Sequence, residues 1–440
     1  MKKNSSFNSL INNKGFLRYF KNTAWVLFEK VLRIIVGLFI GAWVVRYLGP
    51  EDFGLFSFVN SLIYFLIVIS SLGLDGVLVR ELVKTPKDHA KLMGTSFRLK
   101  LISGTTLFLL LLLNCLLFKI NSKMSNLIIV ISFSMIIQSI NVVDFYFQSE
   151  VKSRYVVYAN IFSLSISSIL KVIFIINNFS LFYFGLIVSI DVLALIIGYL
   201  YFYMKDNNIK DWIFDIETAK RLLKYGWPFI LSGVMIAIYM KVDQIMLKFL
   251  IDEKAVGLYA AGVRLSELWY FIPVATASSL FPAIVNAKFI SKKLYNDRLQ
   301  NLYNLMFTMA IIISILVTFF AKWIVITLYG DSFSEASTIL IIHIWSGIFV
   351  FLGVASEKWM LNENLQRIYA INTLLGSISN VSFNLVLIPR YGPIGAAYAT
   401  LVSQFLASYL CLLFFKKTRI NFYRLTKALF FVNYIKYTKK

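Results

Sequence analysis

Charged side chains inside long apolar segments are the residues of this sequence best suited to chemistry. The stretch YMKVDQIMLKFL (residues 239–250) carries Lys241, Asp243 and Lys248 among apolar neighbours. A charge at the centre of a bilayer costs about 3 kcal/mol on insertion scales, so each is a candidate functional residue. Ammonium and guanidinium groups bind phosphate oxygens. We therefore expect an intramembrane site for an anionic, phosphate-bearing substrate.

The spacing within this stretch separates its three charges. Lys241 and Asp243 are two positions apart, so on a helix they project to nearly opposite sides and cannot neutralise each other. Asp243 therefore needs a partner on another helix. Lys248 shares a face with Lys241 but lies near the end of the apolar segment, where its side chain is expected to reach the lipid headgroups.

The other intramembrane candidates form a cationic and an acidic set. We expect these cations to line a pathway for pyrophosphate and sugar groups, with a structural ion pair as their alternative role: Lys30, Arg33, Lys241 and Arg264. We expect these carboxylates to pair with the cations or to couple transport to H⁺ or Na⁺: Glu29, Asp191, Asp243 and Glu267. Residues 29 and 33 are spaced i,i+4, and residues 264 and 267 i,i+3, so each arginine can pair within its own helix. His343 is a further candidate for proton transfer, against a packing or hydrogen-bonding role.

The elements that position these residues are membrane-spanning helices. The 440-residue chain is 59% hydrophobic and only 15% charged, with a mean hydropathy of +0.74, whereas soluble domains are roughly one quarter charged. Apolar runs bounded by charge, Gly, Pro and Asn predict about twelve spans of roughly 20 residues, the length that crosses a bilayer. We therefore expect an all-α membrane protein.

Basic residues cluster in alternate connections, which predicts the orientation of the spans. The clusters lie before the first span, after the second, sixth and eighth, and after the last, so both termini are expected on the cytoplasmic side. The predicted organisation follows the chain: a cytoplasmic arm (1–23), an amino-terminal lobe of six helices (24–204), a basic connection (205–226), a carboxy-terminal lobe of six helices (227–415) and a basic tail (416–440).

A short internal repeat supports two lobes. The turn GPEDFGLFS (49–57) and the turn DEKAVGLYA (252–260) share an acidic start followed by Gly, Leu, an aromatic and a small residue. Gly54 matches Gly257 in this alignment, and the copies are separated by an even number of spans. A parallel repeat of six plus six helices is therefore expected, with a cavity between the lobes.

Several functions lack the residues that they need. The sequence contains no GxxxxGK[ST], HExxH, GxSxG or CxxC motif, so we expect no ATP hydrolysis, no metal centre, no catalytic residues and no cofactor. The net charge of +22 follows the membrane topology, so we expect no nucleic-acid partner. Cys115 and Cys411 lie in apolar runs and are interpreted as small buried residues.

Three stretches resemble the polysaccharide-export flippases of the Wzx type, in the multidrug/oligosaccharidyl-lipid/polysaccharide exporter superfamily. They are RYLGPEDFGLFSF, a central stretch from YGWPFILSG to SSLFPAI, and INTLLGSISNVSFNLVLIPRYGPIGAAYATLVSQ. The matching residues are Trp227, Pro228, Asp243, Gly257, Leu258, Tyr259, Arg264, Leu280, Phe281, Pro282, Asn372, Gly376, Asn380, Asn384, Pro389, Gly392, Gly395, Ala396, Ala397, Ala399 and Thr400. Lys30, Arg33 and Lys241 fall on no motif of the family.

The resemblance implies a transporter rather than an enzyme. A two-lobed protein of the bacterial cytoplasmic (inner) membrane would move an undecaprenyl-pyrophosphate-linked oligosaccharide, a unit of O-antigen (the lipopolysaccharide side chain), capsule or exopolysaccharide, to the outer leaflet by alternating access. Its expected partners are the lipid-linked oligosaccharide, membrane lipids, and the polysaccharide polymerase and chain-length machinery. A cation-coupled multidrug antiporter of the same fold and a membrane polysaccharide polymerase are the alternatives. H⁺, Na⁺ and the membrane potential remain alternative energy sources.

Overall fold

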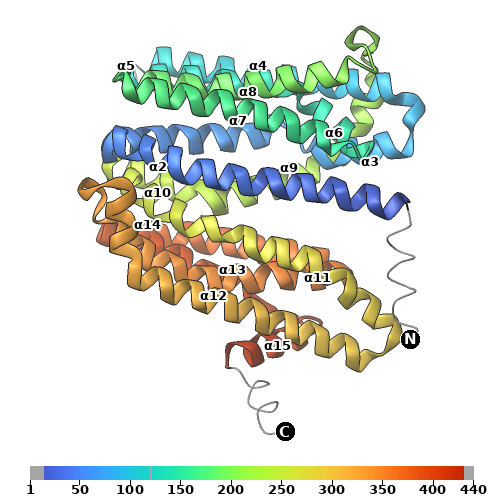
Figure 1. The fold of residues 1–440 in the computed structure, drawn as a ribbon, viewed down its shortest axis with the longest axis vertical. Helices are drawn as coiled ribbons and strands as arrows, with labels where there is room; N and C mark the ends of the chain where they lie inside the picture. Colours follow the sequence, from blue (N-terminus) through green and yellow to red (C-terminus); the bar gives the residue numbers. More distant parts are fainter. Residues whose placement is uncertain (1–13, 119–120, 431–440) are drawn as a thin grey trace. The chain divides into compact units, whose positions relative to one another are not determined.

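Helices make up all the regular secondary structure in the part of the chain that the computed structural model describes, residues 14–118 and 121–430 (Figure 1). The helices are α2 (Lys14–Ser70), α3 (Leu74–Lys84), α4 (His89–Leu117), α5 (Ser122–Ile137), α6 (Val142–Ser149), α7 (Ser153–Ile176), α8 (Leu181–Tyr203), α9 (Ile216–Leu250), α10 (Glu253–Glu267), α11 (Phe271–Ile290), α12 (Lys292–Tyr329), α13 (Ala336–Asn362), α14 (Gln366–Ser408) and α15 (Arg419–Leu429). Most of the predicted amino-terminal arm and the last ten residues of the predicted tail lie outside the described residues. The predicted all-α fold is confirmed.

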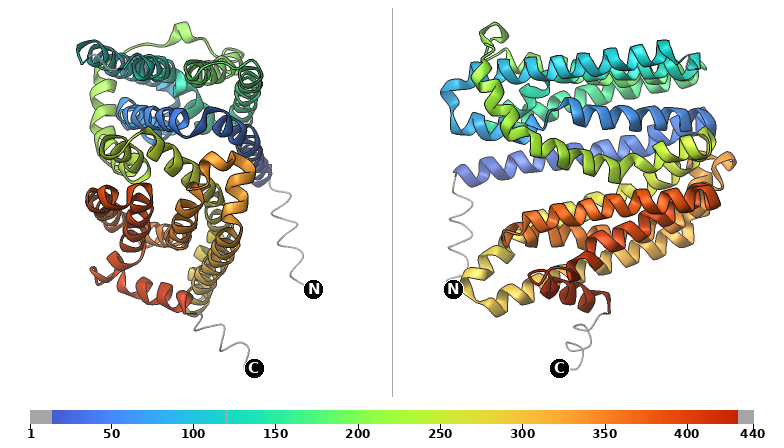
Figure 2. Two further views of the ribbon diagram at one scale, coloured as in Figure 1. Left: turned by 90° about the vertical axis from the view of Figure 1, so that its left-hand side faces the viewer. Right: turned by 180° about the vertical axis from the view of Figure 1, so that it is seen from behind.

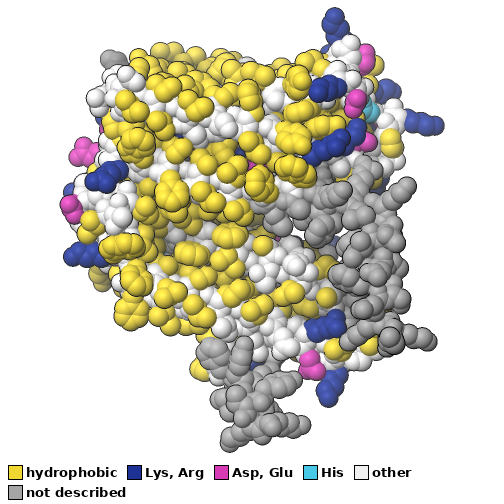
Figure 3. All heavy atoms as spheres, viewed as in Figure 1, with side chains coloured by type: hydrophobic (Ala, Val, Ile, Leu, Met, Phe, Trp, Pro, Cys, Tyr) yellow, Lys and Arg dark blue, Asp and Glu magenta, His cyan; other side chains and the backbone are white. Residues whose placement is uncertain are grey.

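The helices carry the surface of a membrane protein. The described residues contain 10 stretches that are long and apolar enough to cross a bilayer. Large apolar side chains point outward from them, including Phe319 at 81% exposure and Leu116 at 70%. Figure 3 shows hydrophobic side chains along the helices, with most of the charged side chains in view near the helix ends. The protein is therefore a multi-pass membrane protein.

Two of these stretches contain a break between two helical segments. Gly49 in α2 has φ 71° and ψ 173°, and Gly392 in α14 has φ 57° and ψ −137°. A positive φ suits glycine, which has no Cβ to clash. Pro50 and Pro393 follow directly, and proline is favoured at the first position of a helix. Dividing the 10 stretches at these two breaks gives twelve segments in the described part of the chain, the number predicted.

The chain divides into two compact units, the first formed by Met1–Tyr47 and Val59–Val234 and the second by Leu48–Phe58 and Met235–Lys440. In the amino-terminal unit, α8 packs along both α7 and α5, and α5 also contacts α4 (Figure 1). Its core contains buried residues such as Leu78, Met93, Phe147 and Tyr203. This packing fixes the carboxylate-bearing helix α8 against its neighbours.

In the carboxy-terminal unit, α13 packs against both α12 and α14, and the three helices run side by side (Figures 1 and 2). Tyr303, Met306, Phe351 and Ala355 are buried in its core. The short helix α15 contributes Leu425 to the same core. The unit therefore continues beyond the last membrane segment into the part predicted as a basic tail.

The two copies of the repeated turn lie against each other in this unit. A Cβ placed on Gly54 would overlap the backbone oxygen of Glu253, and one placed on Gly257 would overlap the backbone oxygen of Pro50. Glycine is needed at both positions because the two backbones approach too closely for any side chain. The shared Gly-Leu-aromatic pattern thus has a packing explanation at this contact.

Candidate functional site

Asp243 is buried in a set of neutral hydrogen-bond donors. Its side chain lies on α9 and the residue is only 3% exposed. Carboxylate Oδ2 accepts hydrogen bonds from Tyr259 Oη of α10 at 2.5 Å and from Thr400 Oγ1 of α14 at 2.8 Å. Oδ1 accepts from Asn384 Nδ2 of α14 at 2.5 Å. Donors from two other helices therefore hold this carboxylate, and none of these donors is a cation.

A second layer of polar residues surrounds this set. Asn384 Nδ2 also contacts Asn380 Oδ1 at 3.1 Å, and Asn380 Nδ2 lies 3.5 Å from Ser403 Oγ. Ser403 Oγ in turn donates to the Thr400 carbonyl at 3.0 Å. Asn384 Oδ1 is buried and has no hydrogen-bond partner. We call Asp243, Tyr259, Asn380, Asn384 and Thr400 the Asp243 cage.

The cage explains why separate motif residues occur together. Asn380, Asn384 and Thr400 entered the resemblance only as matches to a family hairpin, yet they converge on Asp243. The i,i+4 spacing of two asparagines in an apolar segment places both amides on one helix face. That spacing was a signal for a shared polar site. The role of Tyr259 as the third donor carried no comparable signal.

The chemistry of the cage suits a small ion. Hydroxyl and amide groups can each donate or accept a hydrogen bond, so they can satisfy a carboxylate or present oxygen atoms to a cation. Hard cations prefer oxygen ligands, and a proton needs only a carboxylate. No group of three or more His, Cys, Asp or Glu residues suited to a metal ion occurs in the described part of the chain.

Lys241 lies near titratable residues of two other helices. It is half-buried, and its charge acts on both Glu267 of α10 and His343 of α13. His343 is 3% exposed and its Nδ1 lies 2.8 Å from Ser266 Oγ. The structure therefore places Lys241 close enough for its charge to act on two other predicted residues, Glu267 and His343.

Arg264 lies on the same helix as Glu267 and is half-buried. Its charge acts on Tyr329 at the end of α12. Lys248, expected near the headgroups, pairs with Glu253 at the start of α10. The predicted cations of this unit thus occupy different surroundings, and the charge of Lys241 acts on Glu267.

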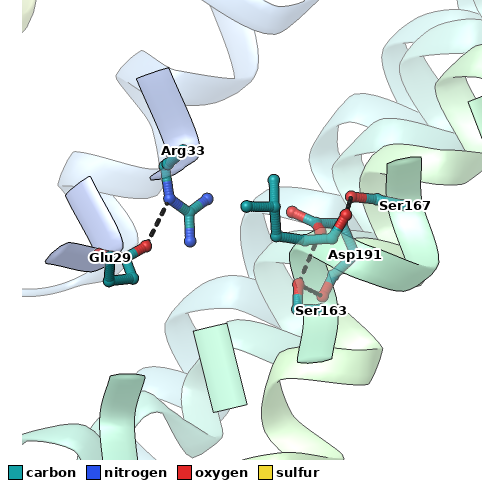
Figure 4. A network of polar contacts seen from close by, with 6 residues as sticks. Glu29, Arg33, Ser163, Ser167 and Asp191 are labelled. Atoms are coloured by element: carbon teal, nitrogen blue, oxygen red, sulfur yellow. Dashed lines mark hydrogen bonds and ion pairs between the residues drawn. The ribbon is translucent and has the colours of Figure 1, made fainter. Parts of the chain in front are cut away.

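In the amino-terminal unit, the predicted carboxylates Glu29 and Asp191 have separate partners (Figure 4). Arg33 Nε donates to Glu29 Oε1 at 2.8 Å, the i,i+4 pairing expected from the spacing. Asp191 Oδ1 of α8 accepts a hydrogen bond from Ser163 Oγ of α7 at 2.6 Å. The Arg33 side chain is 45% exposed, and Lys30 is exposed as well. The Arg33 guanidinium is therefore accessible despite its pairing.

The structure adds an ion pair that the sequence reasoning missed. Lys100 of α4 is 6% exposed, and its Nζ lies 2.5 Å from Asp75 Oδ1 of α3 and 4.7 Å from the ring centre of Phe145. The position of Lys100 within a predicted span was the feature of the sequence that could have indicated a buried ion pair. Its partner lies in another span, 25 positions away in the sequence, so the spacing could not identify it.

A cavity of about 240 Å³ lies inside the carboxy-terminal unit. Its lining combines apolar side chains with the polar residues Tyr239, Glu357, Asn372 and Gln404. Asn372 is 3% exposed, and both polar atoms of its side chain lack a hydrogen-bond partner, as does Tyr239 Oη. Unpaired buried polar groups cost about 1–3 kcal/mol each, so this cavity is suited to a polar guest.

Comparisons with known proteins agree with this architecture. The sequence model of the family described as "Polysaccharide biosynthesis protein" matches residues 19–288. The curated protein "Probable flippase AglR" of Haloferax volcanii is 26% identical over 196 residues, which cover 42% of this chain and 39% of that protein. The match thus spans about two fifths of the relative's length.

Two solved structures share the fold. An inward-facing multidrug resistance MATE family transporter of the MOP superfamily aligns with a TM-score of 0.73 and 17% identity, covering 90% of this chain and 95% of that one. The lipid II flippase MurJ, in an inward closed conformation, aligns with a TM-score of 0.68 and 15% identity, covering 95% and 93%. The predicted MOP-like fold is confirmed. Because the family match extends over more than half of its residues, the chain belongs to the polysaccharide biosynthesis protein family.

Proposed function

We propose that this protein is a flippase that moves an undecaprenyl-pyrophosphate-linked oligosaccharide, a repeat unit of a surface polysaccharide, from the cytoplasmic to the outer leaflet. The family match carries this proposal, because it connects an exporter fold with polysaccharide biosynthesis. The relative named as a flippase supports the same activity. Lys30, Arg33, Lys241 and Arg264 would contact the pyrophosphate and sugar groups along the pathway.

The Asp243 cage would couple transport to an ion. Its carboxylate is held by groups that can either donate hydrogen bonds or offer oxygen ligands, so it can exchange H⁺ or Na⁺ without leaving a buried cation unpaired. The membrane potential is the alternative drive. It would act on the anionic pyrophosphate with about 2.3 kcal/mol per charge per 100 mV.

A deletion strain tests the activity directly. Loss of the protein should make lipid-linked oligosaccharide accumulate on the cytoplasmic leaflet, as measured by mass spectrometry and by protection of the glycan from an externally added glycosidase. Restoring the gene should reverse the accumulation. Glycan units that reach the outer leaflet in the deletion strain but stay unpolymerised would overturn the proposal and favour a polymerase.

A multidrug antiporter is the second candidate, because a multidrug transporter aligns over 90% of the chain. Such a protein should lower the sensitivity of the cell to cationic drugs. Drug resistance that depends on this protein, together with unchanged glycan export in the deletion strain, would favour the antiporter.

A further inference from the structure

A cationic pocket lies at one end of the carboxy-terminal unit, apart from the Asp243 cage. It has a volume of about 740 Å³. Its walls are the end of α11, the start of α12, the end of α13 with the α13–α14 turn, and α15 with the segment before it. Its charged lining residues are Lys288, Lys292, Glu363, Lys417 and Arg424.

Helix α15, which forms one wall of the pocket, is firmly packed against the rest of the unit. Asn421 and Leu425 of α15 are completely buried. Tyr303 Oη of α12 donates to Asn421 Oδ1 at 2.6 Å, and Asn421 Nδ2 donates to Ser356 Oγ of α13 at 2.8 Å. These contacts hold α15 against two membrane segments. The backbone that carries the pocket-lining side chains of α15 is therefore held in place.

The pocket is lined by more cations than carboxylates. Glu363 Oε1 accepts from Lys288 Nζ at 2.9 Å and from Tyr295 Oη at 2.7 Å. Burial raises the pKa of the Glu363 carboxyl, but these two hydrogen bonds and the charges of Lys288 and Arg424 lower that pKa below its ordinary value overall. The single carboxylate is thus ionised at neutral pH and is already occupied by Lys288.

Arg424, Lys292 and Lys417 form no direct ion pair in the described part of the chain. Arg424 Nη2 donates to the Asn296 amide oxygen at 2.6 Å, and its guanidinium lies 5.9 Å from the ring centre of Trp359. Lys292 and Lys417 form no ion pair with any residue in the described part of the chain. Lys292 and Lys417 have no countercharge, and Arg424 shares the charge of Glu363 with Lys288. This excess of cations in one pocket favours an anionic ligand with several acceptor oxygens.

We propose that this pocket binds the phosphate oxygens of an anionic ligand, with Lys292, Lys417 and Arg424 as its contacts. Two sources present this chemistry, an anionic lipid headgroup and a soluble diphosphate. Trp359 and Ile420 add an apolar wall, which suits a ligand that is polar at one end only. The pocket lies at the end of the unit that the distribution of basic residues predicts to be cytoplasmic.

The test uses the full-length protein and a variant that removes the two unpaired cations, Lys292→Gln with Lys417→Gln. Neither lysine supports a described contact, so folding should be unaffected. Binding of inorganic pyrophosphate is measured by calorimetry in a neutral detergent. Retention of phosphatidylglycerol from mixed phosphatidylcholine nanodiscs is measured by native mass spectrometry. Lys210→Gln with Lys220→Gln is the matched control, because it removes the same charge from the other unit.

The wild-type protein and the control should bind at least one of the two probes, and the pocket variant should bind it roughly tenfold more weakly, as expected for the loss of charge-assisted contacts. Added salt should weaken wild-type binding more than variant binding. Loss of phosphatidylglycerol retention alone identifies a lipid headgroup, and loss of pyrophosphate binding alone identifies a soluble ligand. Equal binding by the pocket variant and the wild type, or equal losses in the pocket and control variants, would overturn the proposal.

Discussion

The amino-terminal unit pairs its most deeply buried charges with groups of opposite charge, whereas the carboxy-terminal unit surrounds Asp243 with neutral donors. Glu29 is bound by Arg33, and Lys100 is bound by Asp75. Asp243 instead accepts its hydrogen bonds from hydroxyl and amide groups. All three arrangements satisfy a charge inside a membrane protein. They differ in how the surrounding groups respond when that charge is gained or lost.

An ion pair fixes the charge state of both partners. Removing one member of a buried pair leaves an uncompensated ion and typically costs about 3–5 kcal/mol. Lysine and arginine only donate hydrogen bonds, so they cannot act as ligands of an incoming cation. The hydroxyl and amide groups of the cage can stop donating to the carboxylate and present their oxygen atoms to the cation. The carboxy-terminal unit therefore holds the carboxylate better suited to ion exchange, whereas the pair of Lys100 and Asp75 is better suited to holding α4 against α3.

Asp243→Asn should give the largest effect on transport. The amide is nearly isosteric but has no charge, so glycan export should fall roughly 10- to 100-fold, the range typical of a lost coupling between two ligands. Thermal unfolding of the purified variant should stay close to that of the wild type. Export is measured by complementation of the deletion strain, with the exposed Asp211→Asn as the control. Normal export by the Asp243 variant would exclude the cage as the coupling site.

Asp75→Leu should have a large effect on stability, unlike Asp243→Asn, whose main effect is on transport. Lys100 would keep its charge at 6% exposure without its partner. Because the Asp75 side chain is 52% exposed, we expect a loss of about 2–3 kcal/mol, below the range for fully buried pairs. Thermal unfolding in detergent measures it. The double variant with Lys100→Met should recover part of the loss, and an Asp75 variant as stable as the wild type would contradict the assignment.

The sequence predicted the fold well because its signals were local. Apolar length and basic connections gave the number of segments, and Gly49 and Gly392 were readable as turns because each precedes a proline. The i,i+4 pair of Glu29 and Arg33 also followed from helical spacing alone. Properties that depend on one helix, or on one break between helices, can be derived in this way.

The surroundings of Asp243 could not be derived in the same way, because they depend on helix contacts between distant parts of the chain. Thr400 lies 157 positions from Asp243 and Asn384 lies 141 positions away. Spacing predicts which residues share a helix face, but it does not predict which two faces meet. The sequence predicts a partner for Asp243 on another helix, either a cation or a coupling ion, and the structure places neutral donors of α10 and α14 around its carboxylate. The functional roles of these residues stay predictions.

Tyr259→Phe tests the cage with an intermediate effect. The variant removes the donor at 2.5 Å from Asp243 Oδ2 and leaves the ring in place. We expect a loss of roughly 1.5–2 kcal/mol in stability, the lower part of the range for a hydrogen bond to a charged group, and a change in the ion concentration that gives half-maximal transport. Reconstituted vesicles with varied Na⁺ and pH measure this dependence. An unchanged ion dependence would remove Tyr259 from the coupling site.

Glu29→Gln should give the smallest effect on stability. Glu29 is buried, but the side chain of its partner Arg33 is 45% exposed, so water already stabilises the guanidinium and the pair should contribute less than about 1 kcal/mol. A weak pair leaves Arg33 able to exchange Glu29 for a phosphate oxygen. A double-mutant cycle with Arg33→Gln, followed by thermal unfolding, measures the coupling energy. A coupling above about 2 kcal/mol would place this pair with the fixed pair of Lys100 and Asp75. Arg33 would then be a structural residue, and Lys30 would remain as the proposed pathway cation of the amino-terminal unit.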